Sequence, residues 1–200
     1  VMVADMDVAA AEKTAADIAA QFGVKTAFCK CDVTVKAEVD AMVEATLKAF
    51  GRIDILNNIA GASTKVDFLE MPEEIYDFMM DVNAKGTFLV DQAVLRVMIP
   101  NKSGKIVNMS SMSGKEGYPT NIAYTASKFA VTGMTQAIAK YAAPYNINVN
   151  CVCPGVTNPP HVCHEQGPGS CRLPAPGGAK SHEENDGSQR NRPSCRLALL

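Results

Sequence analysis

Two kinds of hydrophobic pattern alternate along this chain as far as residue 153. Short apolar runs of strand length are followed by longer segments in which apolar residues recur every three to four positions. The runs predict buried β-strands at 1–5, 24–31, 53–59, 105–110 and 147–153. The longer segments predict helices at 7–22, 34–50, 73–99 and 121–142.

Polar, glycine and proline residues mark the ends of these helices. Asp7 and Thr34 are suited to cap the first two helices, because their side-chain oxygens can accept from free backbone N–H groups. Gly23 and Gly51 follow the same two helices, as glycine often does at a helix end, and Pro100 ends the third. Strands that alternate with helices predict an α/β fold: a doubly wound parallel sheet with helices on both faces.

Tyr124 and Lys128 carry the most informative chemistry of the chain. At a spacing of four residues in a helix, both side chains leave the same face, one turn apart. A nearby ammonium stabilises the phenolate form of tyrosine, so that the phenol can exchange a proton with an alcohol or a ketone. Taken alone the pair is weak evidence, since most such pairs lie on solvated helix surface.

Further motifs surround this pair in a definite order. They are Asn58-x-Ala60-Gly61, Asn83, Ser111 thirteen residues before Tyr124, and Pro154-Gly155 after the last predicted strand. Together these residues resemble the short-chain dehydrogenase/reductase family over residues 1 to about 157. The resemblance implies a Rossmann-like fold and hydride transfer between a nicotinamide cofactor and a carbinol or carbonyl carbon.

The resemblance also implies a role for each catalytic residue. Tyr124 would be the general acid/base, and Lys128 would favour its ionised form and hydrogen-bond the nicotinamide ribose. Ser111 would hold the substrate oxygen, with the neighbouring serines at 110 and 113 as alternatives if the register differs. Asn83 would support a water-linked proton relay to Lys128, although a lone asparagine there would more often be a helix cap or a turn residue.

Asp5 indicates which cofactor to expect. It ends the first predicted strand, where a dinucleotide-binding fold places the acid that accepts from the ribose hydroxyls. A carboxylate there repels a 2′-phosphate, so we expect NAD rather than NADP; the alternative is that Asp5 is only a turn residue. The family pattern places the other cofactor contacts at Asp32, Val33, Asn58, Ala60, Gly61, Tyr124, Lys128, Pro154, Gly155, Val156 and Thr157.

Composition narrows the class of protein. A net charge of −2 is not the basic footprint of nucleic-acid binding, and no apolar run approaches the roughly 18 residues of a membrane span. Cysteines occur as C-x-C in strand-like segments, not as the C-x-x-C pairs of zinc sites, and the chain opens on a strand rather than a secretory signal. We therefore expect a cytoplasmic protein with reduced thiols, no metal, no nucleic-acid or membrane partner, and a small alcohol or ketone as substrate.

The start of the chain departs from the family pattern. No G-x-x-x-G-x-G or G-x-G-x-x-G motif, whose backbone amides would cradle a pyrophosphate, occurs before Asp5. We therefore expect a chain truncated at its N-terminus by about one strand–helix unit, roughly 30 residues. Its sheet would lack the central first strand and would form two halves with unpaired edges.

The composition of the chain changes after about residue 157. Residues 158–200 contain six of the eleven prolines and all three histidines, and they have no periodicity before Leu197. We expect a partial dinucleotide-binding domain over 1–157, followed by a disordered or frame-shifted tail over 158–200. His161, Cys163 and His164 match no common zinc spacing, which favours chance enrichment.

Two classes of function fit such a chain. The first is an NAD-dependent dehydrogenase of secondary alcohols, with an NADPH-dependent 3-oxoacyl-carrier-protein reductase as the alternative. The second is an inactive relative that keeps only the helices through which the family forms homodimers or homotetramers, those that carry Asn83 and Tyr124.

Overall fold

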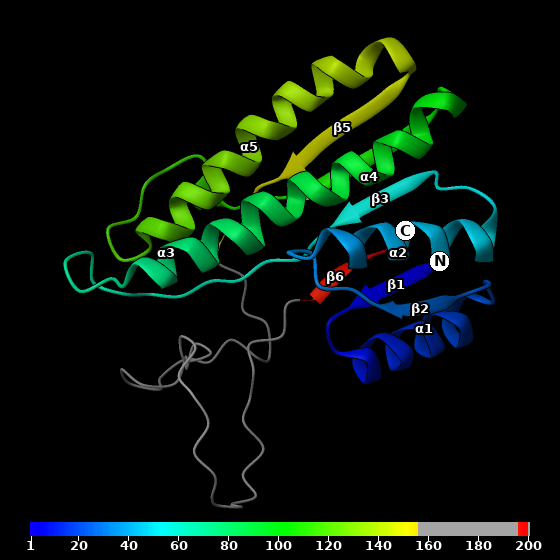
Figure 1. Ribbon diagram of the computed structural model, residues 1–200, viewed down its shortest axis with the longest axis horizontal. Helices are drawn as coiled ribbons and strands as arrows, with labels where there is room; N and C mark the ends of the chain where they lie inside the picture. The colour runs from blue at the N-terminus through cyan, green and yellow to red at the C-terminus, as the bar shows by residue number, and fades with distance from the viewer. Residues whose placement is uncertain (156–195, 200) are drawn as a thin grey trace, which may run out of the picture.

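The computed structural model describes residues 1–155 and 196–199, in which strands and helices alternate as predicted (Figure 1). The strands are β1 (Met2–Asp5), β2 (Ala27–Lys30), β3 (Ile55–Asn58), β4 (Gly104–Met109), β5 (Ile147–Val152) and β6 (Arg196–Leu199). The helices are α1 (Val8–Phe22), α2 (Lys36–Phe50), α3 (Glu73–Met79), α4 (Gly86–Asn101) and α5 (Ile122–Ala142). A π-helical segment, η1 (Met80–Lys85), joins α3 to α4, and short 3-10 turns are η2 (Met112–Gly114) and η3 (Ala143–Tyr145).

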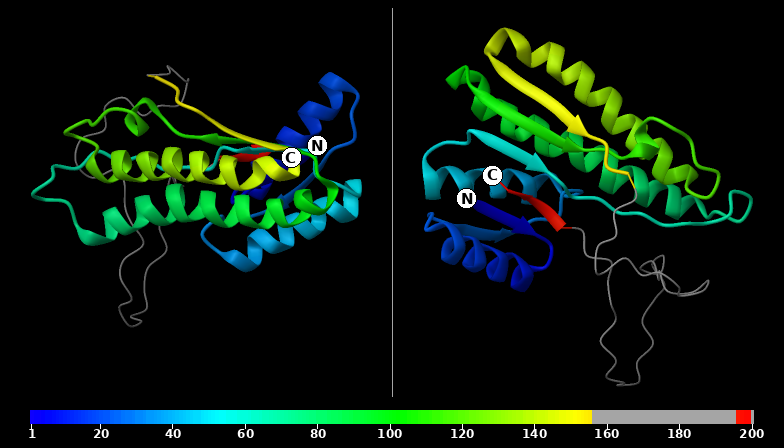
Figure 2. Two further views of the ribbon diagram at one scale, coloured as in Figure 1. Left: turned by 90° about the horizontal axis from the view of Figure 1, so that it is seen from above. Right: turned by 180° about the vertical axis from the view of Figure 1, so that it is seen from behind.

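The described strands form two hydrogen-bonded groups, in keeping with the two half-sheets predicted from the sequence. In the first half β1 pairs in parallel with β2 and antiparallel with β6; in the second, β3, β4 and β5 are parallel in that order. β6 lies between β1 and β3 (Figure 2). The free edge that we expected on β1 is therefore paired, and the sheet is mixed rather than wholly parallel. An open edge can pair with any strand that offers backbone donors and acceptors.

Several expectations fall outside the described residues. Of the predicted tail, only 196–199 are described, as β6. The predicted cofactor contacts Val156 and Thr157 and the three histidines lie outside the described residues.

The main core lies between the second half-sheet and the helices α2 and α4. Its centre is formed by Val39, Val90, Val94 and Ile106, which are fully buried. Burying an aliphatic side chain of this size contributes roughly 1.5–3 kcal/mol. Figure 2 shows α1 on one face of the sheet and α2, α4 and α5 on the other. Within the described residues, helices cover the half-sheet β3–β4–β5 on one face only, and Ile55 of β3 is 47% exposed.

The helix ends agree with the sequence pattern except at Thr34 and Pro100. Helix α4 continues through Pro100 to Asn101 and ends at Lys102, whose backbone angles are left-handed. Asp7 caps α1 by accepting from Ala10 N at 3.0 Å, and Gly23 and Gly51 end α1 and α2 with left-handed backbone angles. Thr34 does not cap α2. Its hydroxyl donates to the Asp32 carboxylate at 2.7 Å, and Val35 occupies the cap position without a side-chain bond.

The long helix predicted over 73–99 is continuous but not uniform. Its middle, Met80–Lys85, is π-helical and contains Asn83. A π-turn widens a helix by one residue per turn, and such turns occur frequently at functional sites. The apolar period of the sequence does not reveal this change, because the flanking turns keep their usual spacing.

Candidate active site

The predicted catalytic residues lie on segments that meet at the carboxyl ends of β3 and β4. Asn58 of β3 lies directly opposite Asn108 of β4, so the two strands end at the same level. The loop after β4 carries Ser111, and α5, which carries Tyr124 and Lys128, packs against both this loop and the π-turn. Ligands of doubly wound sheets bind at this edge.

Lys128 is a buried cation beside the tyrosine ring. The residue is only 3% exposed, its Nζ donates to Met109 O at 2.7 Å, and Nζ lies 5.6 Å from the centre of the Tyr124 ring. Burial lowers the pKa of Lys128 to about 8, because the charged form loses its hydration. Among the described residues Lys128 forms no ion pair, so two of its three N–H donors are available for a ligand.

Asn83 connects the loop after β3 to helix α5. Its Oδ1 accepts from Ala62 N, and its Nδ2 donates to Ala62 O and to Ser127 Oγ, each at 2.9 Å. Ser127 Oγ in turn donates to Tyr124 O at 2.7 Å. The alternative of a helix cap is therefore wrong, since the side chain bonds to other elements. The expected proton relay to Lys128 stays a prediction.

Gly61 approaches both Asn83 and Lys128 closely. A Cβ atom added to Gly61 would lie 3.0 Å from Asn83 Oδ1 and 3.4 Å from Lys128 Nζ. The chain after β3 therefore passes beside both side chains at a distance that favours glycine. The predicted neighbour Ala60 is buried beneath this turn.

Ser111 is the most accessible of the three candidate serines. It precedes the turn η2, is partly exposed, and its Oγ accepts from Ser113 N at 3.2 Å. Ser113 is buried, and the buried Ser110 donates to Lys128 O at 3.1 Å. The backbone of Pro154 lies close by, since its carbonyl accepts from the N–H of the residue after Ser111 at 2.9 Å.

The acids predicted to contact the adenosine half end neighbouring strands. Asp5 is buried, and its Oδ1 accepts from Asp7 N at 2.9 Å. One carboxylate oxygen of Asp5 therefore stabilises the turn after β1, as the alternative interpretation expected. Asp32 follows β2 and accepts from Thr34 N at 2.9 Å. Val33 is buried against Gly86 of α4, where a Cβ atom would lie 2.7 Å from Val33 Cγ2.

Two residues of this region were not predicted from the sequence. Ser127 lies inside the Tyr-x-x-x-Lys motif, but its partner Asn83 is 44 residues away. Asp91 is an acid within the apolar face of α4, and this break in the apolar pattern is the only feature of the sequence that could have indicated a special role. Its carboxylate accepts from Asn58 and Asn108, which places the predicted cofactor residue Asn58 in the core rather than at the surface.

No metal or membrane feature is found in the described part of the chain. No three His, Cys, Asp or Glu side chains group there as metal ligands would, and no helix is long and apolar enough to cross a membrane. The described cysteines are unpaired, and burial raises the pKa of Cys31 to about 12.

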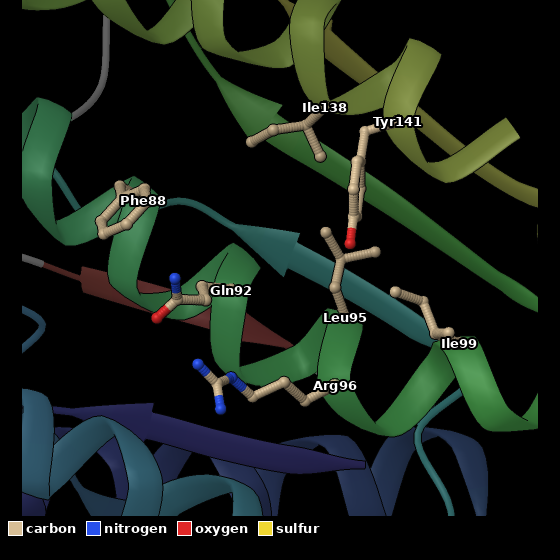
Figure 3. Close-up of a pocket in the computed structure, with 7 residues that line it drawn as sticks. All are labelled: Phe88, Gln92, Leu95, Arg96, Ile99, Ile138 and Tyr141. Atoms are coloured by element: carbon tan, nitrogen blue, oxygen red, sulfur yellow. The ribbon is translucent and has the colours of Figure 1, made fainter.

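A separate groove lies between α4 and α5 (Figure 3). Its first residue on α5, Ile138, is nearly three helical turns after Lys128. Phe88 and Tyr141 at this groove are 44% and 63% exposed. It is lined by Phe88, Gln92, Leu95, Arg96, Ile99, Ile138 and Tyr141, none of which belongs to the predicted site.

Comparison with known proteins decides the family. The family model described as short chain dehydrogenase matches residues 1–166. The chain belongs to this family. Two relatives are the NAD-dependent glycerol dehydrogenase of Listeria innocua serovar 6a, 41% identical over 141 residues, and the 3-oxoacyl-[acyl-carrier-protein] reductase of Thermotoga maritima, 42% identical over 129 residues.

These comparisons confirm the Rossmann-like fold. The solved structure of NAD⁺-bound xylitol dehydrogenase matches with a TM-score of 0.77 and 36% identity. The matches cover 70%, 64% and 79% of this chain for the glycerol dehydrogenase, the reductase and the xylitol dehydrogenase. They cover 56%, 52% and 61% of those proteins, so the short-chain dehydrogenase chain spans little more than half the length of its relatives.

Proposed function

We propose that this short-chain dehydrogenase transfers a hydride between NAD(H) and a secondary alcohol or ketone. The observation that carries the proposal is the buried Lys128 ammonium beside the Tyr124 ring, with Gly61 close to both Lys128 and Asn83. The relatives named as glycerol and xylitol dehydrogenases, one NAD-dependent and one NAD⁺-bound, support an alcohol substrate and NAD.

The residues of the chain fit a nicotinamide cofactor and a proton transfer to or from substrate. When bound, the cofactor supplies the hydride chemistry. Lys128 has two N–H donors for the ribose hydroxyls, and its ammonium lies beside the Tyr124 ring. Tyr124 then takes the proton of the substrate hydroxyl during oxidation and returns it during reduction. Ser111 Oγ donates to the substrate oxygen, on which negative charge develops.

A conservative substitution tests this assignment. Tyr124→Phe should lower NAD⁺ reduction with glycerol or xylitol by at least about 100-fold, because it removes the general acid/base. Tyr76→Phe, at an exposed tyrosine of α3, is the matched control and should keep full activity. We would assay both in the 200-residue chain and in the same chain preceded by a Gly-rich strand–turn–helix unit. Retained turnover by Tyr124→Phe in either form would contradict the assignment.

The preference for NAD is proposed from Asp5. Its carboxylate is anchored by Asp7 N at the end of β1, where it would repel a 2′-phosphate. Asp5→Asn keeps an oxygen for the Asp7 bond but removes the charge, so it should narrow the ratio of NADPH to NADH dissociation constants. An unchanged ratio would contradict this role.

A 3-oxoacyl-carrier-protein reductase is the second candidate, favoured by the 42% identity to the Thermotoga maritima enzyme. It predicts reduction of an acetoacetyl thioester with NADPH in preference to oxidation of polyols with NAD⁺. Absence of both reactions, together with an intact dimer, would favour the third possibility of an inactive relative.

The groove between α4 and α5 is proposed as a homodimer surface of a cytoplasmic protein. Its exposed aromatic residues Phe88 and Tyr141 form apolar area that a second copy would cover. Sedimentation velocity should show a dimer that Phe88→Glu converts to a monomer. A wild-type monomer would refute this surface.

A further inference from the structure

A buried carboxylate on α4 connects the ends of β3 and β4. Asp91 is completely buried on the core side of the helix, next to Val90. Its Oδ2 accepts from Asn108 Nδ2 at 2.8 Å, and its Oδ1 lies 3.4 Å from Asn58 Nδ2, a longer and weaker bond. Because Asn58 and Asn108 are register partners on adjacent strands, one carboxylate contacts both strands at the same level.

Among residues 1–155, no cation pairs with this buried carboxylate. Burial raises the pKa of Asp91 to about 6, while the two amide bonds act in the opposite direction. Lys128, the one buried cation on the elements around Asp91, donates to Met109 O instead. The other charged groups on those elements and beside them are largely solvent-exposed or paired on the surface: Glu38, Asp40, Glu44, Lys48, Asp54, Asp81, Lys85, Arg96, Lys105 and Lys140.

Asn108 accepts no hydrogen bond at its side-chain oxygen from the described residues. Its Nδ2 donates both to Asp91 Oδ2 and to Thr135 Oγ1, at 3.1 Å, while its buried Oδ1 has no hydrogen-bond partner. The Thr135 hydroxyl is already committed as a donor to Val131 O at 2.7 Å. A protonated Asp91 would carry one O–H donor. If the Asn108 amide turned over, its Oδ1 would face Asp91 and could accept from that O–H. Proton uptake by Asp91 is thus linked to the orientation of Asn108.

Both asparagines adjoin the backbone of the catalytic site. Met109, whose carbonyl accepts from Lys128 Nζ, directly follows Asn108. Gly61, which lies close to both Asn83 and Lys128, is three residues after Asn58. These short connections are the route by which a movement of either amide would reach the backbone that positions Lys128.

We propose that Asp91 is a positioning residue of the active site: its carboxylate fixes Asn58 and Asn108, and gain or loss of its proton shifts the backbone at Gly61 and Met109. The catalytic meaning of this shift rests on the proposed function, but the shift itself does not. A positioning role differs from a simple core contact because it predicts a change in the side chains of Asn58 and Asn108 and also a change in the backbone at Gly61 and Met109.

Nuclear magnetic resonance of the ¹⁵N-labelled 200-residue chain tests both predictions between pH 4.5 and 8. The side-chain amide signals of Asn58 and Asn108 and the backbone amide signals of Gly61 and Met109 should shift with one common midpoint near pH 6. Asp91→Asn should remove this midpoint. The control Asp81→Asn, at a surface acid paired with Lys85, should keep it.

The wild-type titration alone can overturn the proposal, so the test does not depend on the folding of any variant. If the two asparagines titrate but Gly61 and Met109 do not, Asp91 is only a core residue. If none of the four titrates near pH 6, or if the midpoint persists in Asp91→Asn, the carboxylate is not the linked group. The titration is made without cofactor, so its result does not depend on NADH binding. A separate finding that the chain does not bind NADH would contradict the proposed function but not the titration.

Discussion

Replacing Lys128 with methionine should stabilise the chain when no cofactor is bound. Methionine has a similar length and no charge, so it can fill the buried site without the cost of removing an ammonium from water. Lys128 is 3% exposed and has no acidic partner among the described residues, so this cost is not repaid by an ion pair. A residue that destabilises the free protein in this way is best explained by a functional role.

The magnitude follows from the lowered pKa of Lys128. A fall from 10.5 to about 8 corresponds to roughly 3 kcal/mol of native-state free energy whenever the amine is charged. The bond from the charged Nζ to Met109 O, lost in the variant, contributes about 1.5 kcal/mol. The net gain near pH 7 is therefore about 1.5 kcal/mol. Between pH 8 and 10.5 the unfolded chain binds this proton and the native chain does not, so wild-type stability rises with pH and the gain shrinks.

Urea unfolding of three proteins at pH 7 and pH 10 measures this difference. Lys128→Met should be about 1.5 kcal/mol more stable than the wild type at pH 7 and much closer to it at pH 10. Lys140→Met, at an exposed lysine of the same helix, should stay within about 0.5 kcal/mol at both pH values. The reasoning is refuted if Lys128→Met is less stable at pH 7, or if its advantage is the same at both.

Three further substitutions test the packing around the site. Asp91→Asn should raise the free energy of unfolding at pH 8 by up to about 3 kcal/mol but change it little at pH 4. The reason is that native Asp91 keeps its proton between pH 3.8 and about 6, and its ionised form destabilises the native chain above pH 6. Urea unfolding at both pH values measures the gain, and a gain independent of pH would contradict this reasoning. Gly114→Ala should destabilise by about 1–3 kcal/mol, because its Cβ would lie 2.2 Å from Ser110 Oγ and 2.7 Å from Lys128 O, whereas Gly117→Ala meets no atom within 4 Å and should melt near the wild-type temperature. Gly133→Ala, in an open part of α5, should stabilise by about 0.5–1 kcal/mol in thermal unfolding, and a loss of stability would mean that this face is covered.

Much of this architecture was predictable because it depends on local signals. Strand and helix periods gave the order of the elements, and Asp7, Gly23 and Gly51 marked helix ends that the structure confirms. The spacing of Tyr124 and Lys128 placed both on one face of α5, where Lys128 Nζ does approach the tyrosine ring.

The remaining features depend on contacts between distant residues. The bonds of Asn83 to Ala62 and Ser127 span 21 and 44 residues, and no window of sequence contains both partners. Asp91 bonds to Asn108 across 17 residues, so its irregular place in an apolar helix face had no visible reason. Pairing of β6 with β1 likewise depends on tertiary structure, because an open strand edge does not specify the direction of its partner.

A titration with NADH, followed by nicotinamide fluorescence, tests the central claim that Lys128 and Tyr124 form a nicotinamide site. It is best made on the chain preceded by a Gly-rich strand–turn–helix unit, in the wild type, Lys128→Met and Lys140→Met. The account predicts saturable binding by the wild type and Lys140→Met, and affinity at least about tenfold weaker in Lys128→Met, which lacks a charge-assisted bond of roughly 1.5–3 kcal/mol to the ribose. Equal affinities in all three proteins, or no binding by the wild type, would contradict the claim.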